Sequence, residues 1–390
     1  MDRSSAHAPS SAPHAATPPH AKGHTWTLRL VAWEVTRSCN LSCVHCRAAA
    51  MDRPYADELT TEEGLRLLEA IATLGSPIVI LTGGEPLLRP DIFDLAAHGH
   101  AKGLRMTMAP NGTLVTLEAA RRMKEAGIQR ISISLDGANA ASHDAFRQVP
   151  GAFEGALMGI RHAKEADLPF QINTTITASN LRELPRIQEL AVKLGAVAHH
   201  IFLLVPVGRG KTLQEQSINA EQYEQTLHWF YEQRDKVPLQ LKATCAPHYY
   251  RILRQRARQE GRSVDRQTFG LDAMTRGCLG GTGFCFISHV GDVQPCGYLE
   301  VTCGNVRQES FPKIWENSLV FQRLRKFKAL EGKCGRCKYV RVCGGCRARA
   351  YEATGDYMAE EPLCLYEPKA PMPNTAGSQE RASEKSDDSY

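Results

Sequence analysis

Short apolar, β-branched runs alternate with segments of helical periodicity between about residues 28 and 207. Runs of the first kind are typical of strands, and segments with apolar residues every three or four positions are typical of helices that bury one face. The predicted strands are LRLVAWEVT (28–36), SPIVILTGG (76–84), LRMTMAPNG (104–112), IQRISISLDG (128–137), FQINTTIT (170–177) and AHHIFLLVP (198–206). The predicted helices include TTEEGLRLLEAIATLG (60–75), LEAARRMKEAG (117–127), FEGALMGIRHAKEA (153–166) and LRELPRIQELAVKLG (181–195).

This alternation of strand and helix, repeated six times, indicates a parallel sheet with right-handed crossovers. Polar and glycine-containing segments (GGEP, APNG and SLDG) fall at the carboxyl ends of the predicted strands. Parallel α/β folds and barrels place their chemistry at that edge. The sequence therefore predicts an α/β fold with a partial, open (β/α)6 barrel and a functional site at its carboxyl edge.

The pattern changes after a helical stretch around residues 219–235. From Cys245 onward the sequence is rich in cysteine and glycine, and it holds ten of the 13 cysteines. We expect a barrel over residues 26–235 and a second, metal-bearing domain over residues 236–367. The terminal segments 1–25 and 368–390 have few large apolar side chains, so we expect disordered tails there.

Composition narrows the classes of function. A formal charge of +5 over 390 residues, without a basic run, does not suggest a nucleic-acid binder. No stretch approaches the roughly 18 apolar residues of a membrane helix, and no secretion signal is apparent, so a cytoplasmic protein is expected. Thiols stay reduced in that compartment, which favours metal binding over disulfides.

The segment RSCNLSCVHCRA (37–48) places Cys39, Cys43 and Cys46 in the loop after the first predicted strand. Three thiolates can hold three irons of a [4Fe–4S] cluster and leave the fourth iron open to a cofactor or substrate. A zinc loop short of one ligand is the alternative, with His45 as an awkwardly placed fourth ligand.

This loop, together with Gly83-Gly84-Glu85-Pro86 after the second predicted strand, resembles the radical SAM superfamily. The resemblance implies that S-adenosylmethionine chelates the open iron and that Gly83, Gly84 and Glu85 bind its methionyl ammonium group. Further implied cofactor contacts are Asn111, Gly112, Ser132, Ser134, Asp136 and, for the methionyl carboxylate, Arg147. Asp136 can also be an ordinary turn residue, and Arg147 a solvated helix residue. His45 departs from the family, which often has an aromatic residue there.

The C-terminal cysteines contain a CxxC…CxxC arrangement that on its own fits a zinc ribbon. The full set resembles the SPASM extension of radical SAM enzymes, except that two rather than three residues precede Cys346. The resemblance implies one or two auxiliary [4Fe–4S] clusters. One ligand set would be Cys278, Cys285, Cys296 and Cys346, and the other Cys334, Cys337, Cys343 and Cys364, with Cys303 a substitute or a bystander.

The string TCAPHYYRIL (244–253), with GCLGGTGFCFISHVGDVQPCGYL, resembles the heme-synthesis branch of the SPASM enzymes, and within it the heme b synthases. This implies oxidative decarboxylation of two propionates of Fe-coproporphyrin III to vinyl groups, with electrons from a flavodoxin- or ferredoxin-type donor. Catalytic roles are implied for Cys245, His248 and Tyr249, although all three can also be core residues. The candidate cations for the propionates are Arg209, Lys211 and Arg251.

Three other functions stay open from the sequence. A sister enzyme acting on didecarboxysiroheme or a heme d1 precursor would share the fold and clusters. A peptide or sulfatase maturase would need a module for its peptide, and residues 1–25 do not look able to form one. A metal-bearing regulator would not need the GGEP segment or a three-cysteine loop.

Overall fold

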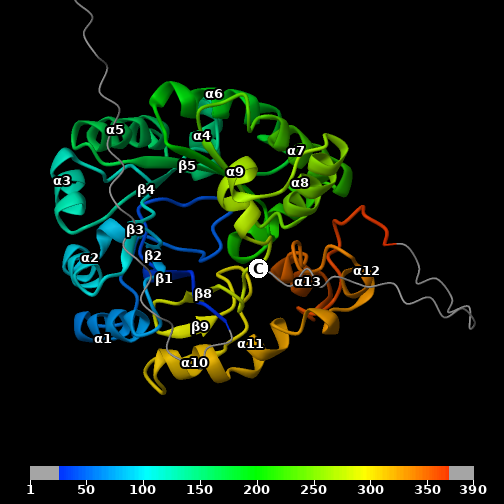
Figure 1. The fold of residues 1–390 in the computed structure, drawn as a ribbon. Helices are drawn as coiled ribbons and strands as arrows, with labels where there is room; N and C mark the ends of the chain where they lie inside the picture. The colour runs from blue at the N-terminus through cyan, green and yellow to red at the C-terminus, as the bar shows by residue number, and fades with distance from the viewer. Residues whose placement is uncertain (1–25, 369–390) are drawn as a thin grey trace, which may run out of the picture.

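A ten-stranded sheet forms the centre of the molecule (Figure 1). The structure is a computed structural model that describes residues 26–368; the two predicted tails lie outside the described residues, apart from residue 368. The strand order is β10-β9-β8-β1-β2-β3-β4-β5-β6-β7. In the described part of the chain, no helix is both long and apolar enough to cross a lipid bilayer.

The first seven strands lie side by side in chain order and are parallel. They are β1 (Leu30–Thr36), β2 (Ile78–Gly83), β3 (Arg105–Met108), β4 (Ile131–Ser134), β5 (Phe170–Ile176), β6 (Ala198–Leu203) and β7 (Gln240–Thr244). The α/β partial-barrel fold is confirmed, and β1 to β6 match the six predicted strands. β7 was not predicted.

The sheet continues past β1 with strands from the cysteine-rich region. β8 (Phe284–Ile287) pairs in parallel with β1, and β9 (Asp292–Gln294) and β10 (Gly304–Asn305) follow as antiparallel neighbours. Backbone hydrogen bonds therefore join strands from both sides of the predicted boundary at residues 235 and 236.

The helices of residues 26–368 are α1 (Thr61–Ala72), α2 (Ile92–Ala101), α3 (Leu117–Glu125), α4 (Ala140–Arg147), α5 (Ala152–Glu165), α6 (Leu184–Leu194), α7 (Ala220–Glu232), α8 (His248–Gln259), α9 (Arg266–Phe269), α10 (Phe311–Asn317), α11 (Leu319–Leu324), α12 (Gly332–Arg336) and α13 (Arg347–Thr354). Of these, α1, α2, α3, α5 and α6 cover the outer face of the parallel strands (Figure 1). Short 3-10 helices span Pro86–Leu88, Leu181–Glu183, Gly208–Gln216, Gly270–Met274 and Phe327–Ala329. The start of α1 is set by a capping box between Thr60 and Glu63, which satisfies free N–H groups of its first turn.

Side chains alternate between the two faces of the strands, as the pleat requires. On β1, Val31, Trp33 and Val35 are buried in the core beneath the helices, whereas Leu30 and Ala32 face the concave side. The concave sides of β1 to β8 together line one cavity of about 1610 Å³. The sheet thus encloses a space that reaches from the loop after β1 to the amino ends of the strands.

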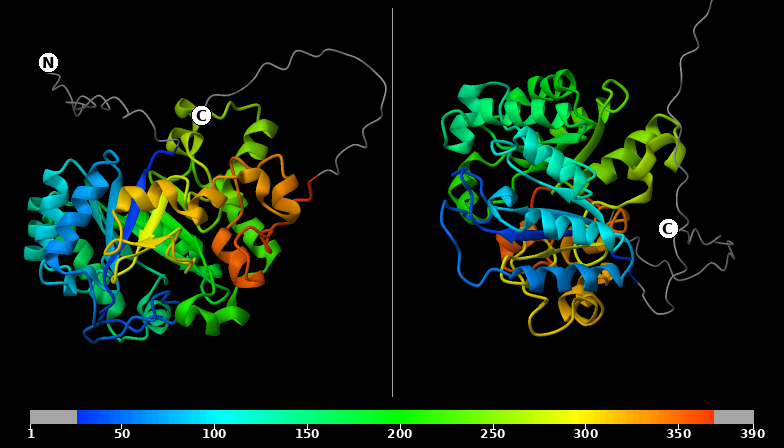
Figure 2. Two further views of the ribbon diagram at one scale, coloured as in Figure 1. Left: turned by 90° about the horizontal axis from the view of Figure 1, so that it is seen from below. Right: turned by 90° about the vertical axis from the view of Figure 1, so that its left-hand side faces the viewer.

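The C-terminal region lies against one end of the sheet (Figure 2). The segments coloured yellow to red, from β8 to α13, lie beside β1 and extend past the end of β6. Arg349, on α13, donates hydrogen bonds to the carbonyl oxygens of Leu203, Leu204 and Cys245 at 3.3, 3.3 and 3.1 Å. This buried arginine ties the cysteine-rich region to the carboxyl ends of β6 and β7.

Candidate active site

Cys39, Cys43 and Cys46 lie in the loop after β1, and all three line the cavity. Cys39 and Cys43 are buried, and burial raises the pKa of Cys39 to about 12. Backbone N–H groups donate to the sulfurs of Cys39 and Cys46 at 3.4 and 3.5 Å, and Arg147 donates to Cys43 at 3.4 Å. Hydrogen-bond donors that point at a buried sulfur stabilise its thiolate form. A bound metal would add the positive charge that deprotonation of a buried thiol requires.

The three loop thiols lie close together, because the charges of Cys43 and Cys46 both act on the pKa of Cys39. A cubane cluster takes each thiolate on a different iron, so three thiolates from one loop would leave its fourth iron open.

Close backbone contacts explain the two glycines after β2. A Cβ atom on Gly83 would lie 2.3 Å from the carbonyl oxygen of Thr36, and one on Gly84 would lie 2.2 Å from that of Ser38. The N–H of Gly84 also donates to Thr36 O at 2.8 Å, and that of Glu85 to Ser38 O at 2.8 Å. The absence of side chains lets the GGEP segment pack directly against the start of the cysteine loop.

Glu85 is fully buried behind this segment. Its carboxylate accepts hydrogen bonds from the N–H groups of Asn111 at 2.6 Å and Leu87 at 3.1 Å. Burial nevertheless raises its pKa to about 7. Glu85 thus joins the carboxyl ends of β2 and β3, and a cation bound nearby would lower its pKa.

Arg147, at the end of α4, pairs with Asp136 after β4 and contacts the sulfur of Cys43. Burial alone would lower the pKa of Arg147, but these two anionic groups outweigh it and raise the pKa. The Nε atom of Arg147 is buried without a hydrogen-bond partner among the described residues. An unsatisfied donor beside the cysteine loop fits an anionic group of a bound cofactor, such as a carboxylate.

The predicted cofactor contacts divide into two groups. Ser132 and several others line the cavity, whereas Glu85 and Asp136 are buried behind it and Gly112 lies outside its lining. The cavity-lining members are Gly83, Gly84, Asn111, Ser132, Ser134 and Arg147. His45 also lines the cavity, and its ring packs on Phe146 with 4.5 Å between ring centroids.

A second cysteine group gathers Cys334, Cys337, Cys343 and Cys364. Backbone N–H groups donate to the sulfurs of Cys334, Cys337 and Cys343 at 3.4, 3.3 and 3.5 Å. Burial raises the pKa of Cys364 to about 11, and the neighbouring charge of Cys334 adds to this rise. The structure thus brings together the four cysteines that the sequence assigned to one auxiliary cluster.

The other predicted group is only partly assembled. Cys278, Cys296 and Cys346 all line the cavity, and burial, reinforced by the charges of Cys346 and Cys278, raises the pKa of Cys296 to about 12. Cys285 does not line the cavity. It is fully buried in the main core, where Cys303 is its neighbour.

The predicted catalytic side chains do not all reach the cavity. Cys245 lines it, whereas His248 and Tyr249 are fully buried outside its lining. The ring of His248 packs against Tyr223 with 4.9 Å between centroids, and burial lowers its pKa to about 4. The hydroxyl of Tyr249 accepts a hydrogen bond from Arg234 at 3.2 Å. Contact of His248 and Tyr249 with substrate stays a prediction, and this placement does not support it.

The cations proposed from the sequence also lie elsewhere. Arg209 donates to the carbonyl oxygens of Cys43 and Ala50 at 2.8 and 2.6 Å, so it supports the cysteine loop. Arg251 is buried and pairs with Glu224 at 2.5 Å. Lys211 is 65 % exposed and lies outside the cavity lining.

Sequence reasoning missed the polar residues on the inner face of the sheet. Arg130 precedes β4, Lys242 lies on β7, and His200 lies between them on β6; all three line the cavity. Burial lowers the pKa of each, and the charge of Lys242 adds to the effect on His200. The sequence does indicate this polar inner face, because polar residues stand at alternate positions of buried strands, as in QINTT and QLKAT.

Two family descriptions match the chain. Residues 33–191 match the radical SAM superfamily, and residues 278–346 match SPASM, described as an iron–sulfur cluster-binding domain. These domains imply [4Fe–4S] clusters and S-adenosylmethionine, and the residues described above fit both. The protein is therefore a radical SAM enzyme with a SPASM domain.

Similar proteins narrow the class of radical SAM enzyme to which the chain belongs. The AdoMet-dependent heme synthase of Nitratidesulfovibrio vulgaris is 58% identical over 347 residues, which cover 89% of this chain and 95% of that one. The AdoMet-dependent heme synthase of Methanosarcina barkeri is 56% identical over 87% of this chain and 97% of that one. The Fe-coproporphyrin III synthase of Methanosarcina barkeri is 33% identical over 86% of this chain and 87% of that one. The chain belongs to the family of the AdoMet-dependent heme synthases.

Solved structures agree on the fold. Streptococcus suis SuiB bound to S-adenosylmethionine has a TM-score of 0.69 at 15% identity, covering 87% of this chain and 78% of that one. The protein anSMEcpe with bound AdoMet has a TM-score of 0.62 at 18% identity, covering 87% and 93%. At such identities the likeness concerns the fold alone.

Proposed function

We propose that this protein is a heme synthase that converts two propionate side chains of Fe-coproporphyrin III into vinyl groups and so forms protoheme. Its membership of the heme synthase family supports the proposal. The observation that carries it is one cavity lined both by the three-cysteine loop and by the partly buried cations Arg130 and Lys242, which suit carboxylates.

The cavity has room for such a substrate. At about 1610 Å³ it exceeds the roughly 300–1,000 Å³ of a usual small-molecule pocket. Its lining combines apolar residues such as Ile80, Phe202 and Phe286 with polar residues on β4 to β7. An apolar wall suits the face of a macrocycle, and the polar part suits its charged edge.

In the proposed reaction each propionate, CH2–CH2–COO⁻, loses one hydrogen atom, CO2 and one electron to become CH=CH2. When bound, the open cluster and S-adenosylmethionine supply the 5′-deoxyadenosyl radical that takes the hydrogen atom. The role of the protein is to hold the propionate carbon at that position and to exclude water.

We assign the cofactor contacts as follows. Cys39, Cys43 and Cys46 hold the cluster, and the backbone of Gly83 and Gly84 forms the wall beside it. Glu85 supports the site for the methionyl ammonium group, and Arg147 offers its unpaired Nε to the carboxylate. Asn111, Ser134 and Asp136 complete the site.

Arg130 and Lys242 are proposed to pair with propionate carboxylates. Neither has an ion-pair partner among residues 26–368; Asp272, whose charge acts on Lys242, is already paired with Arg234. A partly buried cation without its own counter-charge carries a desolvation penalty, which the lowered pKa values express. A bound carboxylate would supply the missing charge.

We further propose two auxiliary clusters that accept the surplus electron of each decarboxylation. Cys334, Cys337, Cys343 and Cys364 would hold one, because they lie together and receive backbone N–H groups. The other would use Cys278, Cys296 and Cys346, which lie at the cavity. A flavodoxin- or ferredoxin-type protein would deliver the electron that starts each turnover.

Anaerobic reconstitution and incubation with S-adenosylmethionine, a reductant and Fe-coproporphyrin III tests the function. We expect heme with two vinyl groups, and one 5′-deoxyadenosine for each propionate lost. A Cys39→Ala variant is the control, and it should form neither product. If 5′-deoxyadenosine forms with didecarboxysiroheme, a heme d1 precursor or a peptide but not with Fe-coproporphyrin III, the proposal is wrong.

A further inference from the structure

We propose that Cys245, rather than Cys285, is the fourth cysteine ligand of the auxiliary cluster held by Cys278, Cys296 and Cys346. The inference rests on the proposed function in one respect, namely that this second auxiliary cluster exists. It concerns the ligand set of that cluster and is independent of the tetrapyrrole that the enzyme converts.

Strand alternation places Cys285 on the wrong face of the sheet. On β8, Phe284 and Phe286 line the cavity, and Cys285 between them must point to the opposite face. Cys285 is paired in register with Val31 of β1, which is also fully buried in the main core. Its thiol neighbour there is Cys303, so reaching the cavity would require β8 to flip its register.

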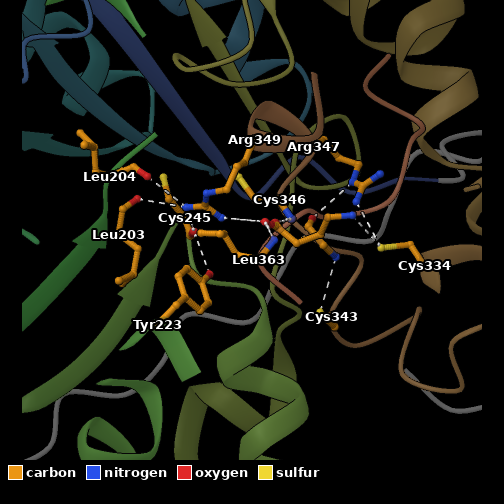
Figure 3. Close-up of polar contacts among 12 residues, drawn as sticks. Leu203, Leu204, Tyr223, Cys245, Cys334, Cys343, Cys346, Arg347, Arg349 and Leu363 are labelled. Atoms are coloured by element: carbon orange, nitrogen blue, oxygen red, sulfur yellow. Dashed lines mark hydrogen bonds and ion pairs between the residues drawn. The ribbon is translucent and has the colours of Figure 1, made fainter. Parts of the chain in front are cut away.

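Cys245 lies where the fourth ligand is needed. It lines the cavity together with Cys278, Cys296 and Cys346, and it packs with Cys296 and Cys346 in one apolar cluster. Figure 3 shows the side chains of Cys245 and Cys346 near each other, with Cys334 and Cys343 further away. Burial raises the pKa of the Cys245 thiol, and the charges of Cys346, Cys296 and Cys278 add to this rise.

The backbone at Cys245 is held in place. Its φ of 55° lies in the left-handed region, which non-glycine residues seldom adopt and which often marks functional sites. Its carbonyl oxygen accepts hydrogen bonds from the hydroxyl of Tyr223 at 3.2 Å and from Arg349 at 3.1 Å (Figure 3). A Cβ atom on Gly277 would lie 2.4 Å from Cβ of Pro247, so this loop packs directly on the segment that carries Cys278.

The proposal changes the role of Cys245 from the one expected from the sequence. A thiolate bound to iron has no S–H hydrogen to give, so Cys245 would not act as a hydrogen or proton donor to substrate. The ligand would instead link the cluster directly to the carboxyl end of β7, next to the cavity.

The experiment uses the full chain with Cys39, Cys43 and Cys46 replaced by alanine, so that only auxiliary clusters remain. In this background we compare Cys245→Ala, Cys285→Ala and Cys278→Ala by iron and sulfide content and by EPR of the reduced protein. Alanine keeps the Cβ atom, so the left-handed backbone at residue 245 gains no strain. Circular dichroism checks that each variant is folded.

For Cys245→Ala and Cys278→Ala we expect the same change, namely loss of about four irons, or conversion of one cluster to a three-iron form. If each single variant loses the whole cluster, a Cys245→Ala/Cys278→Ala double variant should lose no more iron than either one; if each keeps a three-iron form, the double variant should lose that form as well. Cys285→Ala should keep all iron and the parent EPR signal. Retention of iron and signal by Cys245→Ala, or their loss in Cys285→Ala, would overturn the proposal.

A failure of the proposed second auxiliary cluster gives a different result from a wrong ligand assignment. The iron content of the parent background alone tests whether two auxiliary clusters exist, with about eight irons expected. If the parent background holds only about four irons and Cys278→Ala removes none of them, the second auxiliary cluster is absent and the ligand assignment falls with it. If Cys278→Ala removes iron, the comparison of Cys245→Ala with Cys285→Ala decides between the two cysteines. None of these readouts requires heme formation.

Discussion

Lys242→Met tests whether the inner face of the sheet binds the carboxylates of the substrate. Lys242 lines the cavity, and burial lowers its pKa while Asp272 only partly opposes this. Methionine has a side chain of similar length without the charge, so packing in β7 should persist. The change removes one cation where we propose that a propionate binds.

The expected loss of affinity can be estimated from the interaction between Lys242 and a propionate. At an effective dielectric constant of about 20, opposite charges about 4 Å apart attract by about 4 kcal/mol before desolvation is counted. A hydrogen bond to a charged group contributes about 1.5–3 kcal/mol net. The dissociation constant for Fe-coproporphyrin III should therefore rise about 10- to 150-fold, since about 1.4 kcal/mol is a factor of ten.

The assay is a titration of Fe-coproporphyrin III followed by its absorption, without S-adenosylmethionine or reductant, so that binding is separated from turnover. Lys211→Met is the matched control, because Lys211 is 65 % exposed and outside the cavity lining. Because the pKa of Lys242 is lowered, wild-type affinity should fall with rising pH before an ordinary lysine would titrate. Lys242→Met should lack that step. An affinity change below about two-fold, or an equal change in Lys211→Met, would refute the reasoning.

Three further predictions concern the support of the site. Burial alone would raise the pKa of Glu34, but the cations around this carboxylate lower its pKa from 4.5 to about 2. The ionised carboxylate therefore stabilises the fold at neutral pH, and this stabilisation is lost as the pH falls from 4.5 towards 2. Glu34→Gln should cost about 3 kcal/mol at pH 7 and flatten the acid limb of chemical unfolding curves; an unchanged limb would contradict this. Gly84→Ala, whose Cβ meets Ser38 O at 2.2 Å, should lower cluster iron, whereas Gly283→Ala, with its nearest contact at 3.5 Å, should not. Arg147→Lys should weaken S-adenosylmethionine binding about 10- to 100-fold in a filtration assay, and unaltered binding would rule out its proposed contact.

The barrel was readable from the sequence because its buried strands are continuous apolar or β-branched runs. β7 escaped prediction because QLKAT is short and carries Gln240 and Lys242 on its cavity side. Its place in the sheet depends on pairing with β6, which no local pattern reports. The extension of the sheet through β8 has the same cause, since its partner β1 is far away in the chain.

In the candidate site, too, local motifs could be predicted from the sequence, whereas features that depend on packing between distant segments could not. The cysteine loop and the GGEP segment are local motifs, so their resemblance to the radical SAM superfamily, and the cofactor that it implies, could be recognised from the sequence. The direction of a side chain depends on how its element packs: α8 turns His248 and Tyr249 into the core, and the pleat of β8 turns Cys285 away from the cavity. Cys245 reaches the other cysteines only through packing of distant loops.

The central claim is that one iron of the Cys39, Cys43 and Cys46 cluster is open to S-adenosylmethionine. The most direct measurement is EPR of the reduced, anaerobically reconstituted protein before and after S-adenosylmethionine is added. We expect a change in the spectrum of one cluster, and its absence in the Cys39→Ala variant. A spectrum that S-adenosylmethionine leaves unchanged in the wild-type protein, or zinc in place of iron in the anaerobically purified protein, would contradict the account.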